Sequence, residues 1–372
     1  MYFAGVRYAS RVEDERLARE EYLRKETEWR VLSLKLRSAA ENFRGTAGIL
    51  IKDLEYGFEF RHNEDELFAS ASLAKVPIMV AAFKASNEGL LDLDKEMALT
   101  RRDVLPGSGN LRFMSPGTEF TLRELVDLMV SISDNTATNM VTRAVGMDYI
   151  NRAIAEIGME NSILSRRVAD YDARSRGLEN YTTAREMSVI FEDMYRGTLV
   201  NQDVSAKSLR YLFDQRSRDR IPGRLPGDVP VAHKTGLERG VCHDAGIVFD
   251  PRGHYLIAVL TRHSNPNSVP SKNFIADISL MVYERHNMGA GGEAALRGSR
   301  RVTLSPEEVQ RFLFEKGFYE GNIDGIIGPR TRSAVRRFQE FSGLTPDGIV
   351  GPKTTGAMFE YSAAAGKDMF RE

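Results

Sequence analysis

The chain has 372 residues, 42 % of them hydrophobic, which is enough for two or three domains with buried cores. Its 51 basic and 52 acidic residues nearly cancel, so net charge does not recruit nucleic acid or an anionic membrane. The single Cys242 excludes an intramolecular disulfide, and the six histidines lack paired metal-ligand spacing, so we expect no metal and no cofactor.

The N-terminal residues 1–28 are predicted to form a charged helix or stalk, because 13 of positions 11–30 are charged and none is Gly or Pro. From Trp29 the pattern becomes amphipathic, which indicates a helix that covers a sheet. The apolar stretch within the first ten residues is too short for a signal peptide or a membrane span. Either the protein is cytoplasmic or its export segment is missing from this sequence.

Strand patterns lie at both ends of a long helical section, roughly residues 72–222. An alternating hairpin is predicted over 46–62, with a turn near Glu55, and further strands over 229–236, 245–250 and 255–262, followed by a helix over 272–287. Strands at both ends of a helical insert predict an α+β fold with one antiparallel sheet flanked by helices and an all-helical subdomain.

A Gly-rich linker at 289–300 separates this predicted domain, 29–288, from a small C-terminal unit at 301–362. The unit contains a repeat, DGIIGPRT at 324–331 and DGIVGPKT at 347–354, whose copies start 23 residues apart. Each copy places Gly-Pro before a helical segment, and Ser305-Pro306 opens another helix. A compact helical module of about 60 residues is expected.

Ser72 and Lys75 begin an otherwise apolar helical run, and their i, i+3 spacing places a hydroxyl and an amine on one face. A buried lysine must be paired or lose its proton, and an unprotonated amine can activate an alcohol. Alone, the pair is weak evidence for a catalytic site, since a capped helix with a solvated lysine explains the same spacing equally well.

Two further triplets strengthen the assignment: Ser133-Asp134-Asn135 on a tight link between helices, and Lys234-Thr235-Gly236 at the end of a predicted strand. Together with Ser72 and Lys75 they resemble the penicillin-recognising serine acyltransferases, most closely the class A β-lactamases, over roughly residues 30–288. The resemblance implies a five-stranded antiparallel sheet beside an all-helical subdomain.

The resemblance also implies roles for the site residues. Ser72 is the nucleophile, Lys75 the base, Ser133 a bridge between Lys75 and Lys234, and Asn135 a group that orients Lys75 and the substrate amide. The backbone amides of Ser72 and Leu237 would form the oxyanion hole. The substrate would be held by Thr235, Gly236, Arg220 and, in the side-wall loop, Asn110.

The loop that follows departs from the class A pattern. When it is laid on the E-x-x-x-N motif, the deacylating glutamate falls on Val168 and the asparagine on Asp172. Asp170 or Asp172 would substitute only if the loop were displaced by two residues, and loop aspartates are more often capping or solvated groups. General-base assistance is worth about 10²–10⁴-fold, so the acyl-enzyme is expected to clear slowly.

The C-terminal segment 303–359 resembles a peptidoglycan-binding domain of the three-helix type. Nucleic-acid binding by its arginines is disfavoured, because the chain has no basic excess. A peptidoglycan partner implies an extracytoplasmic location, with any membrane anchor in a missing N-terminal segment.

The expected function is therefore a D-Ala-D-Ala peptidase of carboxypeptidase or endopeptidase type, acylated by β-lactams and slow to release them. The alternatives are a class A-like β-lactamase and an inactive peptidoglycan-binding protein. Cys242 and the pair His243-Asp244 follow the Lys-Thr-Gly strand, and we assign them no catalytic role.

Overall fold

The computed structural model describes residues 2–265, 267–288, 306–350, 354 and 357–358. Its largest part is a five-stranded sheet in the order β2-β1-β9-β8-β7, with every neighbouring pair antiparallel. The strands are β1 Thr46–Asp53, β2 Glu59–His62, β7 Val231–Glu238, β8 Val241–Asp250 and β9 Gly253–Arg262. The predicted α+β fold with a five-stranded antiparallel sheet is confirmed.

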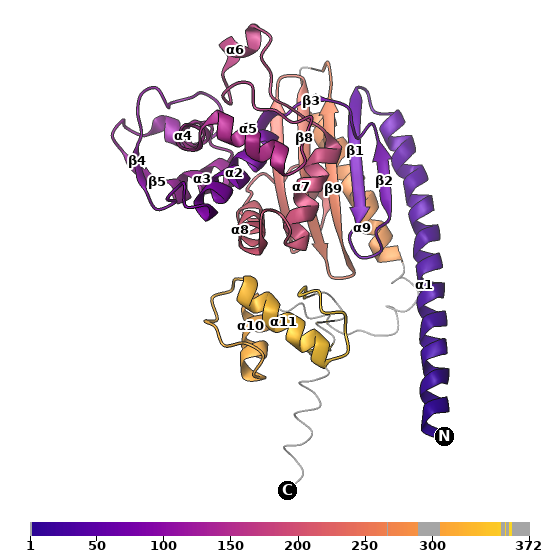
Figure 1. Cartoon of the computed structure of the whole chain (residues 1–372). Helices are drawn as coiled ribbons and strands as arrows, with labels where there is room; N and C mark the ends of the chain where they lie inside the picture. The colour runs from indigo at the N-terminus through magenta and orange to yellow at the C-terminus, as the bar shows by residue number, and fades with distance from the viewer. Residues whose placement is uncertain (1, 266, 289–305, 351–353, 355–356, 359–372) are drawn as a thin grey trace.

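Helices cover both faces of this sheet (Figure 1). On one face α1, Tyr2–Glu41, and α9, Val269–Met288, pack on strand residues such as Ile257 and Val248. On the other face α7, Ala184–Arg196, and α8, Gln202–Phe213, continue into the helical subdomain. The two hydrophobic clusters are separate because successive strand side chains point to opposite faces.

The helical subdomain positions the polar motifs. Its elements are η1 Ala71–Ala74, α2 Lys75–Asn87, η2 Leu111–Phe113, α3 Leu122–Ser131, α4 Asn135–Val145, α5 Met147–Glu156 and α6 Tyr171–Ser175. Short strands β3 Phe68–Ala69 and β6 Tyr181–Thr182 pair with each other, as do β4 Glu96–Ala98 and β5 Glu119–Thr121, while η3 Ile221–Arg224 leads to the sheet. Helix α3 begins with a capping box of Thr121 and Glu124.

The C-terminal region has helices α10 Pro306–Glu315 and α11 Pro329–Phe341 among its described residues. The sequence repeat is also present in the structure, because the equivalent aspartates of its two copies each accept a hydrogen bond from a glutamine side chain. Gln310 Nε2 donates to Asp324 Oδ1 at 2.7 Å, and Gln339 Nε2 donates to Asp347 Oδ1 at 2.6 Å. The linker 289–300 and the second Gly-Pro, at 351–352, lie outside the described residues.

The structure corrects two strand boundaries. Strand β7 continues two residues past Gly236 to Glu238, so Lys234-Thr235-Gly236 lies within the strand. Strand β8 begins at Val241, so Cys242, His243 and Asp244 are strand residues paired with both β7 and β9. The ends of both strands are set by pairing with the neighbouring strands, which cannot be read from the local sequence.

Helix α1 is continuous through Trp29, where we predicted a change of pattern. Trp29 is buried, whereas side chains from residue 16 to 23 are exposed. No helix in the described part of the chain combines the length and apolar character needed to cross a bilayer.

Candidate active site

The predicted nucleophile, Ser72, lies in a strained turn at the start of α2. Ala71, which precedes it, has φ of 46°, a left-handed conformation that residues other than glycine rarely adopt. The 3₁₀ turn η1 places Ser72 half-buried and Lys75 fully buried at the first residue of α2. Pro77 falls within the first helical turn, where its missing N–H costs no hydrogen bond.

The Lys75 amine contacts residues at the link between α3 and α4. Its Nζ contacts the Ser133 carbonyl oxygen at 2.6 Å, Ser133 Oγ at 3.0 Å and Asn135 Oδ1 at 2.9 Å. Asn135 therefore orients Lys75, as predicted. Ser72 is not among these three partners, so the direct hydrogen bond that the i, i+3 spacing suggested gives way to three acceptors from another element.

Ser133 bridges the two lysines. Its Oγ lies 3.0 Å from Lys75 Nζ and 3.0 Å from Lys234 Nζ, and its backbone φ of 58° turns the hydroxyl into the site. Lys234 also donates to the Thr235 carbonyl oxygen at 3.0 Å. We name Lys75, Ser133 and Lys234 the lysine–serine centre.

The three contacts of Lys75 have the same direction, because Nζ donates to the Ser133 carbonyl oxygen, to Ser133 Oγ and to Asn135 Oδ1. Ser133 Oγ therefore accepts from both Lys75 and Lys234. A hydroxyl that contacts both amines can relay a proton between them.

Burial is the main cause of the altered acidity of both lysines. It lowers the pKa of Lys75 well below its ordinary value; the positive charge of Lys234 lowers it further, and Asp134 opposes this. Burial also lowers the pKa of Lys234 to about 7, with Arg220 lowering it and Asp244 raising it. Both shifts favour loss of a proton from the centre, and burial is the first cause of each.

Asp134 is a structural residue whose importance the sequence did not reveal. Its buried carboxylate accepts from the backbone N–H groups of Asn110 at 2.6 Å, Leu111 at 2.9 Å and Ala137 at 2.9 Å. It thus caps α4 and anchors the side-wall loop at once. The Asn110 side chain is exposed, as a substrate-binding role requires.

Strand β7 brings the second set of predicted residues to the same place. Lys234 and Thr235 are buried, Gly236 lies opposite His243, and the Leu237 side chain is 46 % exposed. The strand packs against η1, so the backbone of β7 lies beside the turn that carries the nucleophile.

Arg220 is buried just before η3, with 3 % exposure, and its Nε has no hydrogen-bond partner in the described part of the chain. Its positive charge acts on Lys234. Arg220 and Lys234 thus provide two cationic groups suited to a substrate carboxylate.

The loop of residues 166–179 has valine at the position of the expected glutamate, and its two aspartates are a helix cap and a solvated side chain. Val168 is half-buried, the Asp170 carboxylate caps α6 through the Ala173 N–H at 2.9 Å, and Asp172 is exposed. Among the described residues, the carboxylate of Asp134 is the one that raises the pKa of Lys75. The prediction that the loop aspartates are capping or solvated groups agrees with this geometry.

Ion pairs close this loop and attach it to β7. Arg166 Nη2 lies 2.6 Å from Glu179 Oε1 and 3.3 Å from Glu238 Oε2, and Arg174 contacts the same two carboxylates at 2.9 Å and 3.2 Å. Glu238 is the last residue of β7. The acidic side chains nearest this loop are therefore neutralised by arginines.

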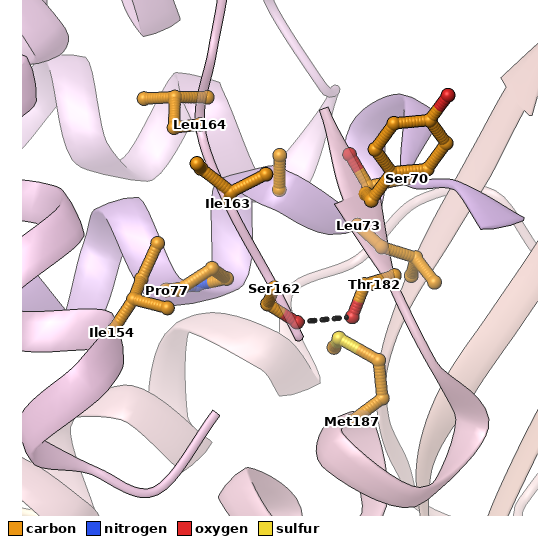
Figure 2. Close-up of a pocket in the computed structure, with 11 residues that line it drawn as sticks. Ser70, Leu73, Pro77, Ile154, Ser162, Ile163, Leu164, Thr182 and Met187 are labelled. Atoms are coloured by element: carbon orange, nitrogen blue, oxygen red, sulfur yellow. Dashed lines mark hydrogen bonds between the residues drawn. The ribbon is translucent and has the colours of Figure 1, made fainter. Parts of the chain in front are cut away.

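A small cavity adjoins the nucleophile turn (Figure 2). Its volume is about 10 Å³, room for about one water molecule. Ser162 Oγ donates to Thr182 Oγ1 at 2.9 Å on its wall, and Leu73 and Pro77 supply apolar contacts. No carboxylate lines the cavity. Among the described residues no cluster of His, Cys, Asp or Glu is arranged to hold a metal ion.

Comparison with known proteins identifies the family. Residues 32–286 match the family described as "Beta-lactamase enzyme family", and residues 305–358 match the one described as "Putative peptidoglycan binding domain". The chain belongs to the β-lactamase enzyme family and is a serine hydrolase of that family with a C-terminal domain of the second family.

The relatives include β-lactamases and a penicillin-binding protein. The β-lactamase VEB-1 of Pseudomonas aeruginosa is 24 % identical over 68 % of this chain and 89 % of its own. A β-lactamase of Sphaerobacter thermophilus is 32 % identical, covering 69 % of this chain and 97 % of its own, with a TM-score of 0.64. An acyl-enzyme complex of a PBP-A mutant with penicillin G is 27 % identical, covering 69 % and 96 %, with a TM-score of 0.64.

Proposed function

We propose that Ser72 attacks the carbonyl of D-Ala-D-Ala stem peptides and of β-lactams, forming an acyl-enzyme that β-lactams leave slowly. The lysine–serine centre carries this proposal, because it places a buried amine, whose pKa is lowered, beside a hydroxyl that contacts a second lysine. Lys75 takes the proton of Ser72, and Ser133 delivers a proton to the leaving nitrogen.

Substrate positioning follows from the groups around the centre. Lys234, Thr235 and Arg220 hold the substrate carboxylate, and Asn135 and Asn110 line the side where the amide enters. The backbone N–H groups of Ser72 and Leu237 stabilise the oxyanion, where each donor is worth about 3 kcal/mol.

Slow release is argued from the 166–179 loop. Val168 cannot accept a proton, Asp170 is occupied as a helix cap, and arginines neutralise Glu179 and Glu238. A bulky β-lactam acyl group would therefore wait for an unassisted water, whereas a smaller peptidyl group leaves room for one.

A second candidate is β-lactam hydrolysis as the biological activity. The names of two relatives favour it, since VEB-1 and the solved structure at 32 % identity are β-lactamases. The loop chemistry favours the peptidase, and turnover decides between the two.

Acylation and turnover are measured on the full chain. A fluorescent penicillin should label the wild type and the exposed-serine control Ser115→Ala, and should not label Ser72→Ala. Release of D-alanine from a pentapeptide ending in D-Ala-D-Ala, but not from its L-Ala counterpart, supports the peptidase. Rapid turnover of a chromogenic cephalosporin supports the second candidate, and absence of any labelling leaves a peptidoglycan-binding protein without catalysis.

We further propose that the C-terminal domain holds the enzyme on peptidoglycan, outside the cytoplasmic membrane where that polymer lies. A tether of this kind raises the effective substrate concentration around a modest site. Co-sedimentation of the full chain with purified peptidoglycan, and not with cellulose, tests the tether; equal recovery with both polymers would contradict it.

A further inference from the structure

His243 lies where two halves of the site meet. It is a fully buried residue of β8, directly opposite Gly236 of β7, and η1 packs against both strands. The nucleophile turn and the β7 backbone supply the two N–H groups of the proposed oxyanion hole, from Ser72 and Leu237. One side chain thus lies between them.

Both ring nitrogens of His243 have fixed partners. The Thr261 N–H donates to Nδ1 at 3.1 Å, so the proton is on Nε2, which donates to the Ala69 carbonyl oxygen at 2.9 Å. Phe68 meets the ring edge-on at a centroid distance of 5.9 Å. Burial lowers the pKa of His243 to about 4, which keeps this neutral tautomer at working pH.

The Ala69 carbonyl belongs to the segment that sets the nucleophile. It precedes Ala71, whose φ of 46° is strained, and Ser72 follows directly. A strained turn persists only where its surroundings over-determine it. The hydrogen bond from His243 is such a restraint, applied three residues before the nucleophile.

Because Gly236 has no side chain, the His243 ring can also make a close contact with β7. A Cβ atom added there would lie 3.1 Å from His243 Cδ2 and 3.3 Å from the Ser70 carbonyl oxygen. The ring therefore touches the strand at the residue before Leu237 and, through Ala69, the turn before Ser72.

We infer that His243 is a positioning residue that sets the spacing of the Ser72 and Leu237 backbone amides, and so the geometry of the oxyanion hole. The inference rests on the proposed acylation of Ser72. Because the oxyanion hole acts on the transition state, disturbing it should slow the acylation step and leave the initial binding of β-lactam unchanged.

Two matched variants separate positioning from simple packing. In His243→Gln the longer amide can still donate to Ala69, whereas in His243→Asn the shorter one reaches only the Thr261 side. The acylation rate constant and the β-lactam dissociation constant are measured by stopped flow with a fluorescent penicillin, alongside thermal melting. His243→Asn should acylate at least about 10-fold more slowly with an unchanged dissociation constant, and His243→Gln within about threefold of wild type.

Each outcome is decisive. Acylation of His243→Asn at the wild-type rate, or equal slowing of both variants in proportion to their loss of melting temperature, would overturn the inference. Should His243→Asn not fold, His243→Phe fills the ring space without polar atoms and carries the same expectation. Failure of the wild type to acylate would instead overturn the proposed function, which distinguishes the two.

Discussion

The lysine–serine centre and the 166–179 loop use charge in opposite ways. In the centre, Lys75 and Lys234 are buried and form no ion pair with any described carboxylate. Burial therefore lowers the pKa of both amines and favours loss of a proton. In the loop, Arg166 and Arg174 are paired with Glu179 and Glu238. One region is suited to proton transfer and the other is held by ion pairs, and this contrast is the basis of the proposal that acyl groups are captured faster than they are released.

Removing the base should have the largest effect. Lys75→Met is expected to slow acylation by about 10³–10⁴-fold, because the Ser72 alcohol loses its proton acceptor. Stopped-flow labelling with a fluorescent penicillin measures it. Lys207→Met, at an exposed lysine paired with Asp203 on α8, is the matched control and should acylate normally. Equal rates for the two variants would show that Lys75 is not the base.

Breaking the loop's ion pairs should come next. Arg166→Met leaves the half-buried Glu179 and Glu238 paired with Arg174 alone, and removing one partner of a fully buried pair costs about 3–5 kcal/mol, which is the upper limit here. Urea unfolding measures this loss, which should far exceed the roughly 0.5 kcal/mol expected for the exposed Lys207→Met. A loss as small as the control's would mean that the loop is not held by these pairs.

Introducing a carboxylate at position 168 should speed the release of the acyl group. Val168→Glu is expected to shorten the lifetime of the penicillin adduct by about 10–10²-fold, and Val168→Gln, of matched size, should leave it unchanged. The lifetime is followed by intact mass spectrometry after removal of free penicillin. Identical lifetimes in both variants would place the barrier to release elsewhere than in this position.

The pH dependence of acylation should show the smallest effect, up to about tenfold per pH unit. Lys234 binds the substrate carboxylate only while it is protonated, and its pKa is about 7, so acylation by penicillin should decline above that pH. On the acid side, protonation of Lys75 removes the base. Penicillin methyl ester lacks the carboxylate and should show no alkaline decline; a decline equal to that of penicillin would contradict the assignment.

The same shift has a consequence for folding. Lys234 has a pKa of about 7 in the folded chain and 10.5 in the unfolded chain, so the unfolded chain binds more protons between these values. The contribution of Lys234 to the free energy of unfolding therefore rises with pH across this range. Urea titrations of wild type and Lys234→Met at pH 7 and 9 should converge as pH increases.

The sequence predicted what short motifs and periodicity encode. The three motifs carried the resemblance to a known family, and it was the resemblance that implied a bridge by Ser133 between Lys75 and Lys234. The expectation that the loop aspartates are capping or solvated groups is met by Asp170, which caps α6, and by the exposed Asp172.

Long-range partners were beyond the sequence. The register of β8 with β7 and β9 places His243 opposite Gly236, and nothing local in the sequence distinguishes it from an ordinary core histidine. Asp134 looked like a helix cap, yet it also binds the loop at Asn110. The spacing of Ser72 and Lys75 gave a shared face but could not show that Ser133 and Asn135 compete for the amine.

The steady-state occupancy of Ser72 tests the central claim most directly. With benzylpenicillin in excess, intact mass spectrometry of the full chain should show nearly all molecules carrying one penicilloyl group at Ser72 while little penicillin is hydrolysed. Unmodified protein beside fully hydrolysed penicillin would contradict the account, because it would mean that release is faster than capture despite the absence of a loop carboxylate at Val168.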